Sequence, residues 1–293
     1  MLNLTPEEFM PLIKMALEED IGHGDATSIA TVPFEMEARA MMVPRQNMVI
    51  CGLGVAQMVF QEVDPNITVV SNKSDGRQVN AGEELLHIVG PARSILTAER
   101  TALNFVQRLS GVATQTARYV KAIEGTKAKI LDTRKTTPGW RKLEKYAVAC
   151  GGGVNHRVGL FDLILIKDNH LAAIRQQTPR AIIEAVRRSR ETSPNLKVEV
   201  EADTLDDVSE AVEAGADIIM LDNMPPDTIR QALRIIDGRA KTEASGGITL
   251  QTIRAVAETG VDYISVGALT HSAIAVDIAL DFVSAPASVV GHR

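Results

Sequence analysis

The sequence predicts an α/β fold whose second half is a parallel β-sheet, covered by helices and curved into a barrel. Short apolar runs recur in that half, and each ends in a polar or glycine residue. The residues after four successive runs lie 21, 23 and 22 positions apart: Glu201, Asp222, Ser245 and Gly267. Helical segments fill the gaps, so the pattern is a strand–helix array of the kind that forms barrels. We count six such strands and allow for a seventh, and we therefore expect an incomplete barrel.

The elements of this half follow in a regular order. Near-continuous apolar runs are typical of strands that are buried on both faces. The segments between them carry apolar residues at helical spacing. We expect strands at 129–132, 163–166, 198–200, 218–221, 241–244 and 263–266, and helices at 205–214, 227–236 and 250–259.

The first half is expected to begin and end in helix, with strands between. A threonine, a proline and two glutamates at 5–8 mark a helix start, and the glycines of 22–24 mark its end. From 38 to 90, short apolar runs alternate with turn residues, which indicates strands. From 91 to 125 the helical spacing returns, with a break expected at 110–111.

Composition and charge exclude several classes of protein. The 293 residues include 31 Lys plus Arg and 37 Asp plus Glu, a net charge of −6. Nucleic acids and anionic membranes both attract positive fields, and aromatic residues that could stack on bases are only 3%. Acidic residues near the N-terminus argue against a signal peptide, and Cys51 and Cys150 lack metal or disulfide spacing. We expect a cytoplasmic protein that binds neither nucleic acid nor membrane.

Basic residues are expected to meet at one mouth, because the carboxyl ends of parallel barrel strands form a common edge. Grouped like charges repel one another, so they indicate an anionic ligand such as a carboxylate or phosphate. The alternative is that each cation pairs with a neighbouring acid such as Asp132 or Asp168. The basic residues expected at this mouth are Arg134, Lys135, His156, Arg157 and Lys167.

Two glycine-containing turns follow the last two strands, at 245–247 and 265–268. Barrels often bind phosphate there through backbone N–H groups, which glycine allows to approach closely. The alternative is that both segments are only tight turns. His271, just beyond, is expected either to contact a phosphate or to cap a helix.

Two carboxylates end adjacent strands of the predicted sheet. Glu201 and Asp222 could share a magnesium ion with a pyrophosphate and stabilise positive charge on a sugar. The alternative is that they only neutralise Lys135 or Lys167.

These residues together resemble the quinolinate phosphoribosyltransferase family. The resemblance covers nearly the whole chain apart from its C-terminal end. Trp140 stands where the family usually has an aliphatic residue, and we expect a small effect at most. The matching segments are 17–28, 132–139, 151–157, 167–170, 221–223 and 245–247.

The resemblance implies the type II phosphoribosyltransferase fold. An N-terminal α/β sandwich at 1–112, completed by a C-terminal helix within 271–293, packs against an open, TIM-like barrel of about seven strands at 113–270. The resemblance also implies a homodimer, with a hexamer as a further form, in which the partner's N-terminal domain supplies an arginine to each site. Arg100 matches that arginine.

The resemblance further implies the reaction. Quinolinate and phosphoribosyl pyrophosphate give nicotinate mononucleotide, pyrophosphate and CO2, a step of de novo NAD biosynthesis that uses Mg²⁺ and no organic cofactor. Lys135, Glu201 and Asp222 are the expected catalytic residues, and the two acids are also the expected metal ligands. The expected quinolinate-binding residues are Arg100, Thr133, Arg134, Lys135, His156, Arg157 and Lys167. The expected phosphoribosyl pyrophosphate-binding residues are Lys135, Asn169, Glu201, Asp222, Ser245, Gly246, Gly247, Ser265, Gly267 and His271.

Three other interpretations stay open at this point. Lys167 at a strand end could form a Schiff base, as in a barrel aldolase. The chain could be a phosphoribosyltransferase for another ring, or a molybdenum-operon paralogue with the same fold. A polyanion-binding module would draw on the arginines of 187–190, which are also typical of a solvated helix face.

Overall fold

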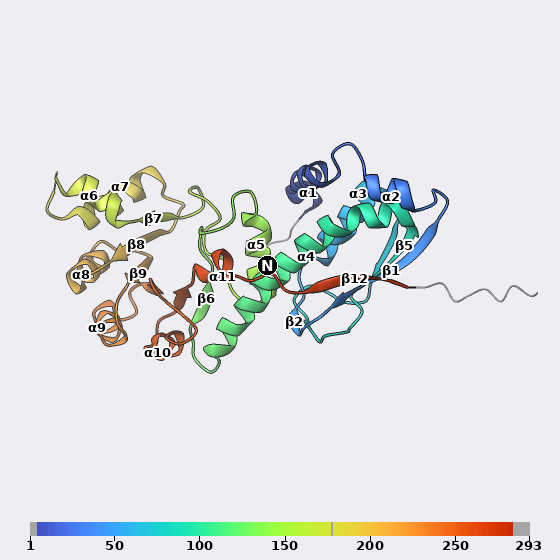
Figure 1. Ribbon diagram of the computed structural model, residues 1–293. Helices are drawn as coiled ribbons and strands as arrows, with labels where there is room; N and C mark the ends of the chain where they lie inside the picture. Colours follow the sequence, from blue (N-terminus) through green and yellow to red (C-terminus); the bar gives the residue numbers. More distant parts are fainter. Residues whose placement is uncertain (1–4, 177, 284–293) are drawn as a thin grey trace, which may run out of the picture. The chain divides into compact units, whose positions relative to one another are not determined.

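The computed structural model describes residues 5–176 and 178–283 and divides into two compact units (Figure 1). The first unit takes residues up to Gln115 and from Ala273 onward, together with the insertion Pro138–Gly152. The second unit takes Thr116–Thr137 and Gly153–Ser272. Among the described helices, none is both long and apolar enough to span a bilayer.

The first unit is built on an antiparallel sheet with strand order β12-β1-β5-β3, beside a short β2-β4 pair. Helix α4 begins in this unit and continues into the second. The elements are α1 (Pro6–Ile21), α2 (Ala26–Thr31), β1 (Glu37–Pro44), β2 (Met48–Val49), α3 (Leu53–Val63), β3 (Thr68–Ser71), β4 (Gln78–Val79), β5 (Leu86–Pro91), α4 (Ala92–Ala122), α5 (Arg141–Cys150) and β12 (Ile278–Val283).

The predicted start of α1 is confirmed. The Thr5 N–H donates to a Glu8 carboxylate oxygen at 3.1 Å, and the Glu8 N–H bonds back to the Thr5 carbonyl at 3.0 Å. These contacts satisfy backbone groups that a helix end leaves without partners.

The prediction of strands throughout 38–90 was wrong for α3. Its residues Leu53, Ala56 and Phe60 recur at helical spacing and are buried, so the short apolar run is one face of a helix. The Asp75 carboxylate accepts the N–H groups of Gly52 and Leu53 at 2.9 and 3.1 Å. A side chain distant in sequence therefore caps this helix, which local patterns do not reveal.

The predicted break at 110–111 is also absent, because α4 runs unbroken through it. A Cβ on Gly111 would lie 2.2 Å from the Ile274 carbonyl oxygen, so the glycine allows a close chain crossing. The Ser110 hydroxyl accepts from the Cys51 N–H at 2.9 Å. Both residues serve tertiary contacts, and these offset the roughly 1 kcal/mol that a helical glycine costs.

The C-terminal segment that completes the first unit was expected to be helical, and this was wrong for its described part. Residues 278–283 form β12, which pairs antiparallel with β1 so that Met42 faces Leu280 and Ala40 faces Phe282. The added strand pairs an edge that β1 would otherwise expose. The remainder, 284–293, lies outside the described residues.

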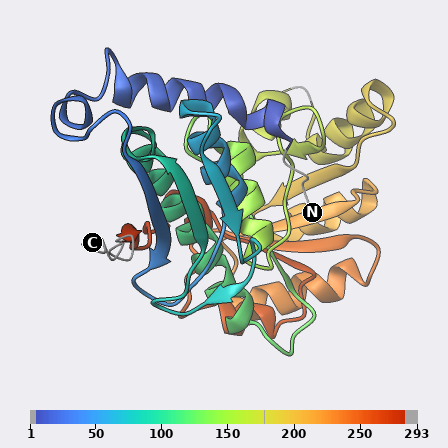
Figure 2. The same ribbon diagram turned by 90° about the vertical axis from the view of Figure 1, so that its right-hand side faces the viewer.

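The second unit is the predicted strand–helix array (Figure 2). Its six strands are all parallel, in the order β6-β11-β10-β9-β8-β7, so β6 and β7 stand at opposite ends of the sheet. A single parallel bridge joins Val154 to the free side of Leu131 in β6. The open barrel is therefore confirmed, with this bridge where a seventh strand would begin.

The six strands and the helices at 205–213 and 226–236 match the predicted ranges closely, the last predicted helix is shorter, and the other helices had no predicted range. The elements of the second unit are β6 (Lys129–Leu131), β7 (Ile164–Ile166), α6 (Asp168–Arg175), α7 (Ala181–Thr192), β8 (Val198–Ala202), α8 (Leu205–Glu213), β9 (Ile218–Asp222), α9 (Pro226–Ile236), β10 (Lys241–Ser245), α10 (Ile253–Ala257), β11 (Tyr263–Ser265) and α11 (Ala268–His271). The helices α7, α8 and α9 lie along the outside of the sheet (Figure 1).

Candidate active site

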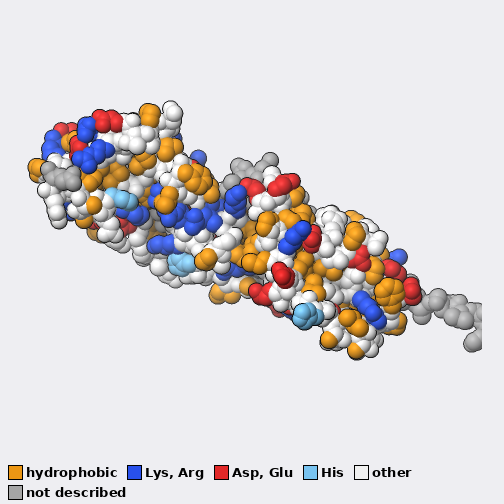
Figure 3. All heavy atoms as spheres, turned by 90° about the horizontal axis from the view of Figure 1, so that it is seen from above, with side chains coloured by type: hydrophobic (Ala, Val, Ile, Leu, Met, Phe, Trp, Pro, Cys, Tyr) orange, Lys and Arg blue, Asp and Glu red, His pale blue; other side chains and the backbone are white. Residues whose placement is uncertain are grey.

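A pocket of about 560 Å³ opens at the carboxyl ends of the parallel strands in the second unit. Strand tips of one parallel sheet meet at the same edge, so residues distant in sequence converge there. Lys and Arg side chains gather on the face of this unit seen in Figure 3. The pocket is lined by Thr133, Arg134, Lys135, His156, Arg157, Leu165, Lys167, Glu201, Met220, Asp222, Asn223, Glu243, Ser245, Gly246, Gly247 and Ser265.

Two guanidinium groups face this pocket without a carboxylate partner. Within the described part of the chain, neither Arg134 nor Arg157 forms an ion pair, and the buried Nε of Arg134 has no hydrogen-bond partner. Burial, followed by the charge of Arg134, lowers the pKa of Arg157. Two partly desolvated like charges side by side favour binding of an anion.

The third cation is already paired. The Lys167 Nζ lies 2.6 Å from a carboxylate oxygen of Glu201, one strand away on β8. The alternative that Glu201 neutralises a lysine therefore holds for this pair. The contact is only partly buried, with 43% of the Lys167 side chain exposed, so an anionic ligand can compete for the ammonium group.

The loop that carries the second guanidinium is held by a buried acid, Asp132. Its carboxylate accepts the Asn155 amide at 2.7 Å and the His156 backbone N–H at 2.8 Å. The Asp132 N–H donates to the Val154 carbonyl oxygen at 3.2 Å. Asp132 thus positions the segment that presents His156 and Arg157 to the pocket.

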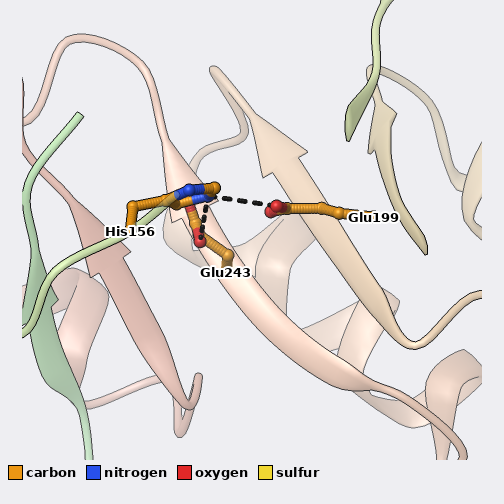
Figure 4. A group of neighbouring side chains, drawn as sticks. All are labelled: His156, Glu199 and Glu243. Carbon is orange, nitrogen blue, oxygen red and sulfur yellow. Dashed lines mark ion pairs between the residues drawn. The ribbon is translucent and has the colours of Figure 1, made fainter. Parts of the chain in front are cut away.

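The imidazole of His156 contacts two acids that sequence reasoning missed (Figure 4). Its Nε2 lies 3.0 Å from Glu199 and 3.5 Å from Glu243, and its Nδ1 accepts the Arg157 N–H at 2.6 Å. Both ring nitrogens therefore face protein groups. The missed signal was charge inside buried strands, since Glu199 and Glu243 are 0% and 1% exposed.

Acidic side chains gather on the other side of the pocket. Ligand oxygens of Glu201, Asp203 and Asp222 all lie within 4.8 Å of one another. Burial, followed by the charge of Asp222, raises the pKa of Asp203. Oxygen donors that repel one another in this way fit a hard divalent cation such as Mg²⁺. Asp203 was not among the predicted ligands.

The turn after β10 is shaped for a close approach of backbone. Gly246 and Gly247 have φ angles of +89° and +60°, and a Cβ on Gly246 would lie 2.1 Å from the Asn223 amide oxygen. Only glycine fits at Gly246 without displacing Asn223. Such a turn exposes backbone N–H groups to a ligand.

A second glycine lies beside a predicted catalytic lysine. A Cβ on Gly267 would meet the Lys135 Cδ at 3.0 Å and the His271 Nε2 at 3.1 Å. The Thr133 hydroxyl accepts the Lys135 N–H at 3.1 Å, and the Thr270 hydroxyl donates to the Lys135 carbonyl at 2.7 Å. Gly267 and His271 therefore adjoin the pocket next to Lys135.

Two predicted residues are not among these lining residues. Asn169 is exposed in the first turn of α6, and Arg100 is exposed on α4 in the first unit. The arginines of 187–190 belong to α7, where they pair with Glu184, Glu191 and Asp217. That cluster is the solvated helix face that the sequence allowed.

Comparison with protein families accounts for this site. Residues 25–110 match the N-terminal domain and residues 112–281 the C-terminal domain of the quinolinate phosphoribosyl transferase model. The chain belongs to the quinolinate phosphoribosyltransferase family.

Known members of the family are similar along most of their length. The chain is 46% identical to the nicotinate-nucleotide pyrophosphorylase [carboxylating] of Mycobacterium leprae, over 92% of this chain and 95% of that protein. It is 45% identical to the probable enzyme of that name from Bacillus subtilis, over 90% and 89%. The solved nicotinate-nucleotide pyrophosphorylase of Francisella tularensis superposes with a TM-score of 0.90 at 42% identity, over 96% and 98%.

Proposed function

We propose that the chain is a carboxylating nicotinate-nucleotide pyrophosphorylase. It transfers the phosphoribosyl group of phosphoribosyl pyrophosphate to quinolinate and releases nicotinate mononucleotide, pyrophosphate and CO2, in the synthesis of NAD. Family membership supports this activity. The observation that carries it to the site is that two guanidinium groups without an ion-pair partner and an acidic cluster lie at the same strand edge.

The basic side of the pocket binds quinolinate. Arg134 and Arg157 take the two carboxylates, since a guanidinium matches a carboxylate in planar, bidentate geometry. Lys167 leaves Glu201 for a substrate carboxylate, and Thr133 borders the same wall. His156 contributes mainly by holding the Arg157 backbone, because its own nitrogens are engaged by protein groups.

The glycine side of the pocket binds phosphoribosyl pyrophosphate. The turn at 245–247, with Ser265, Gly267 and His271, offers backbone and side-chain donors to the 5′-phosphate. Lys135 lies between this side and the basic side, where it faces the departing pyrophosphate. Asn169 is the outermost of the proposed contacts.

The acidic side stabilises the ribose as pyrophosphate leaves. Glu201 and Asp222, with Asp203 beside them, face the positive charge that develops on the sugar ring. The same carboxylates would hold Mg²⁺, which neutralises charge on the pyrophosphate when it is bound. The strand tips fix both substrates side by side, so orientation supplies much of the rate.

The active assembly is a homodimer in the cytoplasm, or a hexamer built from such dimers. Arg100 of the partner subunit completes each quinolinate site. Mixing Arg100→Ala chains with Lys135→Ala chains tests this proposal, since each mixed dimer regains one intact site. Random mixing should restore about a quarter of wild-type activity, and no recovery in verified mixed dimers would contradict a shared site.

A direct assay tests the activity itself. Purified protein with Mg²⁺ and phosphoribosyl pyrophosphate is given quinolinate or nicotinate, and nicotinate mononucleotide and CO2 are measured. Quinolinate should give equal amounts of both products, and nicotinate little of either. A preference for nicotinate would favour a phosphoribosyltransferase of the same fold with another ring substrate.

A further inference from the structure

Beneath the strand tips, two glutamates and a histidine form a buried cluster (Figure 4). Glu199 lies on β8 and Glu243 on β10, on either side of β9 in the sheet. The His156 Nε2 lies 3.0 Å from the first and 3.5 Å from the second. Glu243 and His156 both line the pocket, so the cluster forms part of its floor.

Several polar atoms of this cluster lack hydrogen bonds of good geometry among the described residues. Beyond the His156 contact at 3.0 Å, the Glu199 carboxylate and one Glu243 oxygen have no further hydrogen bond of good geometry in the described part of the chain. Two ionised carboxylates side by side in a buried site repel each other and lose their hydration. A proton held on one of them removes the repulsion, lowers the cost of lost hydration and supplies a hydrogen-bond donor.

Glu243 is the acid that keeps the proton. Burial, followed by the charge of Glu199, raises its pKa to about 8, although His156 opposes the shift. The other charged groups of the pocket are Arg134, Lys135, Arg157, Lys167, Glu201 and Asp222. The raised pKa favours the neutral, protonated form of Glu243 at the pocket floor.

The reaction requires a proton, if the proposed function holds. When CO2 leaves, the bond between a ring carbon and its carboxylate breaks, and the electron pair stays on that carbon beside the cationic ring nitrogen. The carbon becomes a C–H group only by taking up a proton. An acid with a pKa near the working pH suits this step best. The arginines keep their protons, and Lys167 is paired with Glu201.

We propose that Glu243 is the general acid that protonates the ring carbon from which CO2 departs. The proton passes from the Glu243 carboxyl to that carbon, and the carboxylate left behind regains a proton from water that enters through the pocket. His156 and Glu199 are positioning residues, because they fix the carboxyl group and set how firmly it holds its proton.

The variant Glu243→Gln tests this role, because a glutamine amide resembles the neutral acid in shape but donates no proton to carbon. Rapid-quench measurements follow pyrophosphate and nicotinate mononucleotide separately. The variant should bind quinolinate with an unchanged Kd and release pyrophosphate in the first turnover. Nicotinate mononucleotide should form about 10²-fold or more slowly, with the carboxylated nucleotide accumulating on the protein.

Glu199→Gln is the matched control, since it changes the neighbouring buried acid and leaves the proposed donor in place. Removing the Glu199 charge makes Glu243 ionise more easily. The rate of nicotinate mononucleotide formation should therefore begin to fall at a lower pH than in the wild type. Below that pH the variant should stay active. A merely structural role would lower the rate equally at all pH values.

Exchange in D2O gives a second readout that needs no turnover. The wild type, incubated with nicotinate mononucleotide alone, should exchange the hydrogen on that ring carbon, as seen by proton NMR, and more rapidly as pH rises through about 8. Glu243→Gln should not catalyse this exchange.

Three results would overturn the proposal. One is equal, wild-type rates of pyrophosphate and nucleotide formation in Glu243→Gln. Another is a parallel loss of both products together with quinolinate binding, which is the signature of a structural role. The third is absence of exchange in the wild type. Failure of the wild type to form any nicotinate mononucleotide from quinolinate would instead contradict the proposed function.

Discussion

The same strand places two glutamates at two depths, and their environments differ. Glu201 at the tip of β8 keeps 10% of its side chain exposed and pairs with Lys167 at 2.6 Å. Glu199, two residues earlier, is fully buried and faces His156 and a second acid. Alternation along a strand sends both side chains to the pocket side. Depth thus separates a carboxylate that pairs with a cation at the strand tip from carboxylates that face each other in the buried layer.

Among the substitutions considered, removal of a guanidinium group near the strand tips should lower the catalytic rate most. Arg157→Ala should lower kcat/KM for quinolinate about 10³-fold, because a substrate carboxylate loses a charge-assisted bidentate partner. The KM for phosphoribosyl pyrophosphate should change much less. Steady-state kinetics with each substrate varied in turn measure both values.

Arg188→Ala is the control, since Arg188 pairs with Glu184 on the exposed face of α7. It should retain nearly wild-type kinetics. Equal losses in the two variants would show that the tip arginine acts only through the stability of the chain.

Neutralising the tip acid should have the next largest effect. Glu201→Gln should lower kcat about 10²-fold and change the KM for quinolinate little, because the carboxylate acts on charge that develops only in the transition state. Asp203→Asn, in the same acidic group, should lower kcat less. A fall in affinity with intact kcat would instead assign Glu201 to substrate binding alone.

The buried acid Glu243 should make the stability of the fold depend on pH. The pKa of Glu243 is raised from 4.5 to about 8 in the folded chain. Between these values the folded state binds more protons than the unfolded state, so the free energy of unfolding falls as pH rises. Glu243→Gln should flatten this slope, by on the order of 1 kcal/mol or more across the window. Urea unfolding of both proteins from pH 5 to 9 measures it, and identical slopes would contradict a proton on Glu243.

The residues at the strand tips were predictable from the sequence, whereas the buried acids of the pocket floor were not. Periodic strand ends place Arg134, Lys167 and Asp222 at one edge by topology alone, and the structure brings them into one pocket. Glu243 was hidden because the run 241–244 was taken as apolar, although a glutamate interrupts it. The contact between Glu199 and His156 depends on how far the loop at 153–157 enters the barrel, which Asp132 decides through tertiary hydrogen bonds.

Local sequence patterns also failed to predict some secondary structure in the first unit. The strand assignment failed at α3 and the helix break failed at Gly111, and in both places a distant group supplies the deciding contact. Sequence periodicity reports which face of an element is buried. It does not report a partner that arrives from elsewhere in the chain.

Trp140 belongs to the first unit, and its substitution should show the smallest effect. It stacks on Phe105 in the first unit, with ring centroids 4.8 Å apart and an interplanar angle of 18°. Trp140→Leu keeps apolar bulk but loses the aromatic pair, so it should lower the free energy of unfolding by about 1 kcal/mol. Because the pocket residues belong to the second unit, kcat should stay within about twofold of the wild type. A large loss of kcat with unchanged stability would place Trp140 in the function of the site and extend the comparison beyond the barrel.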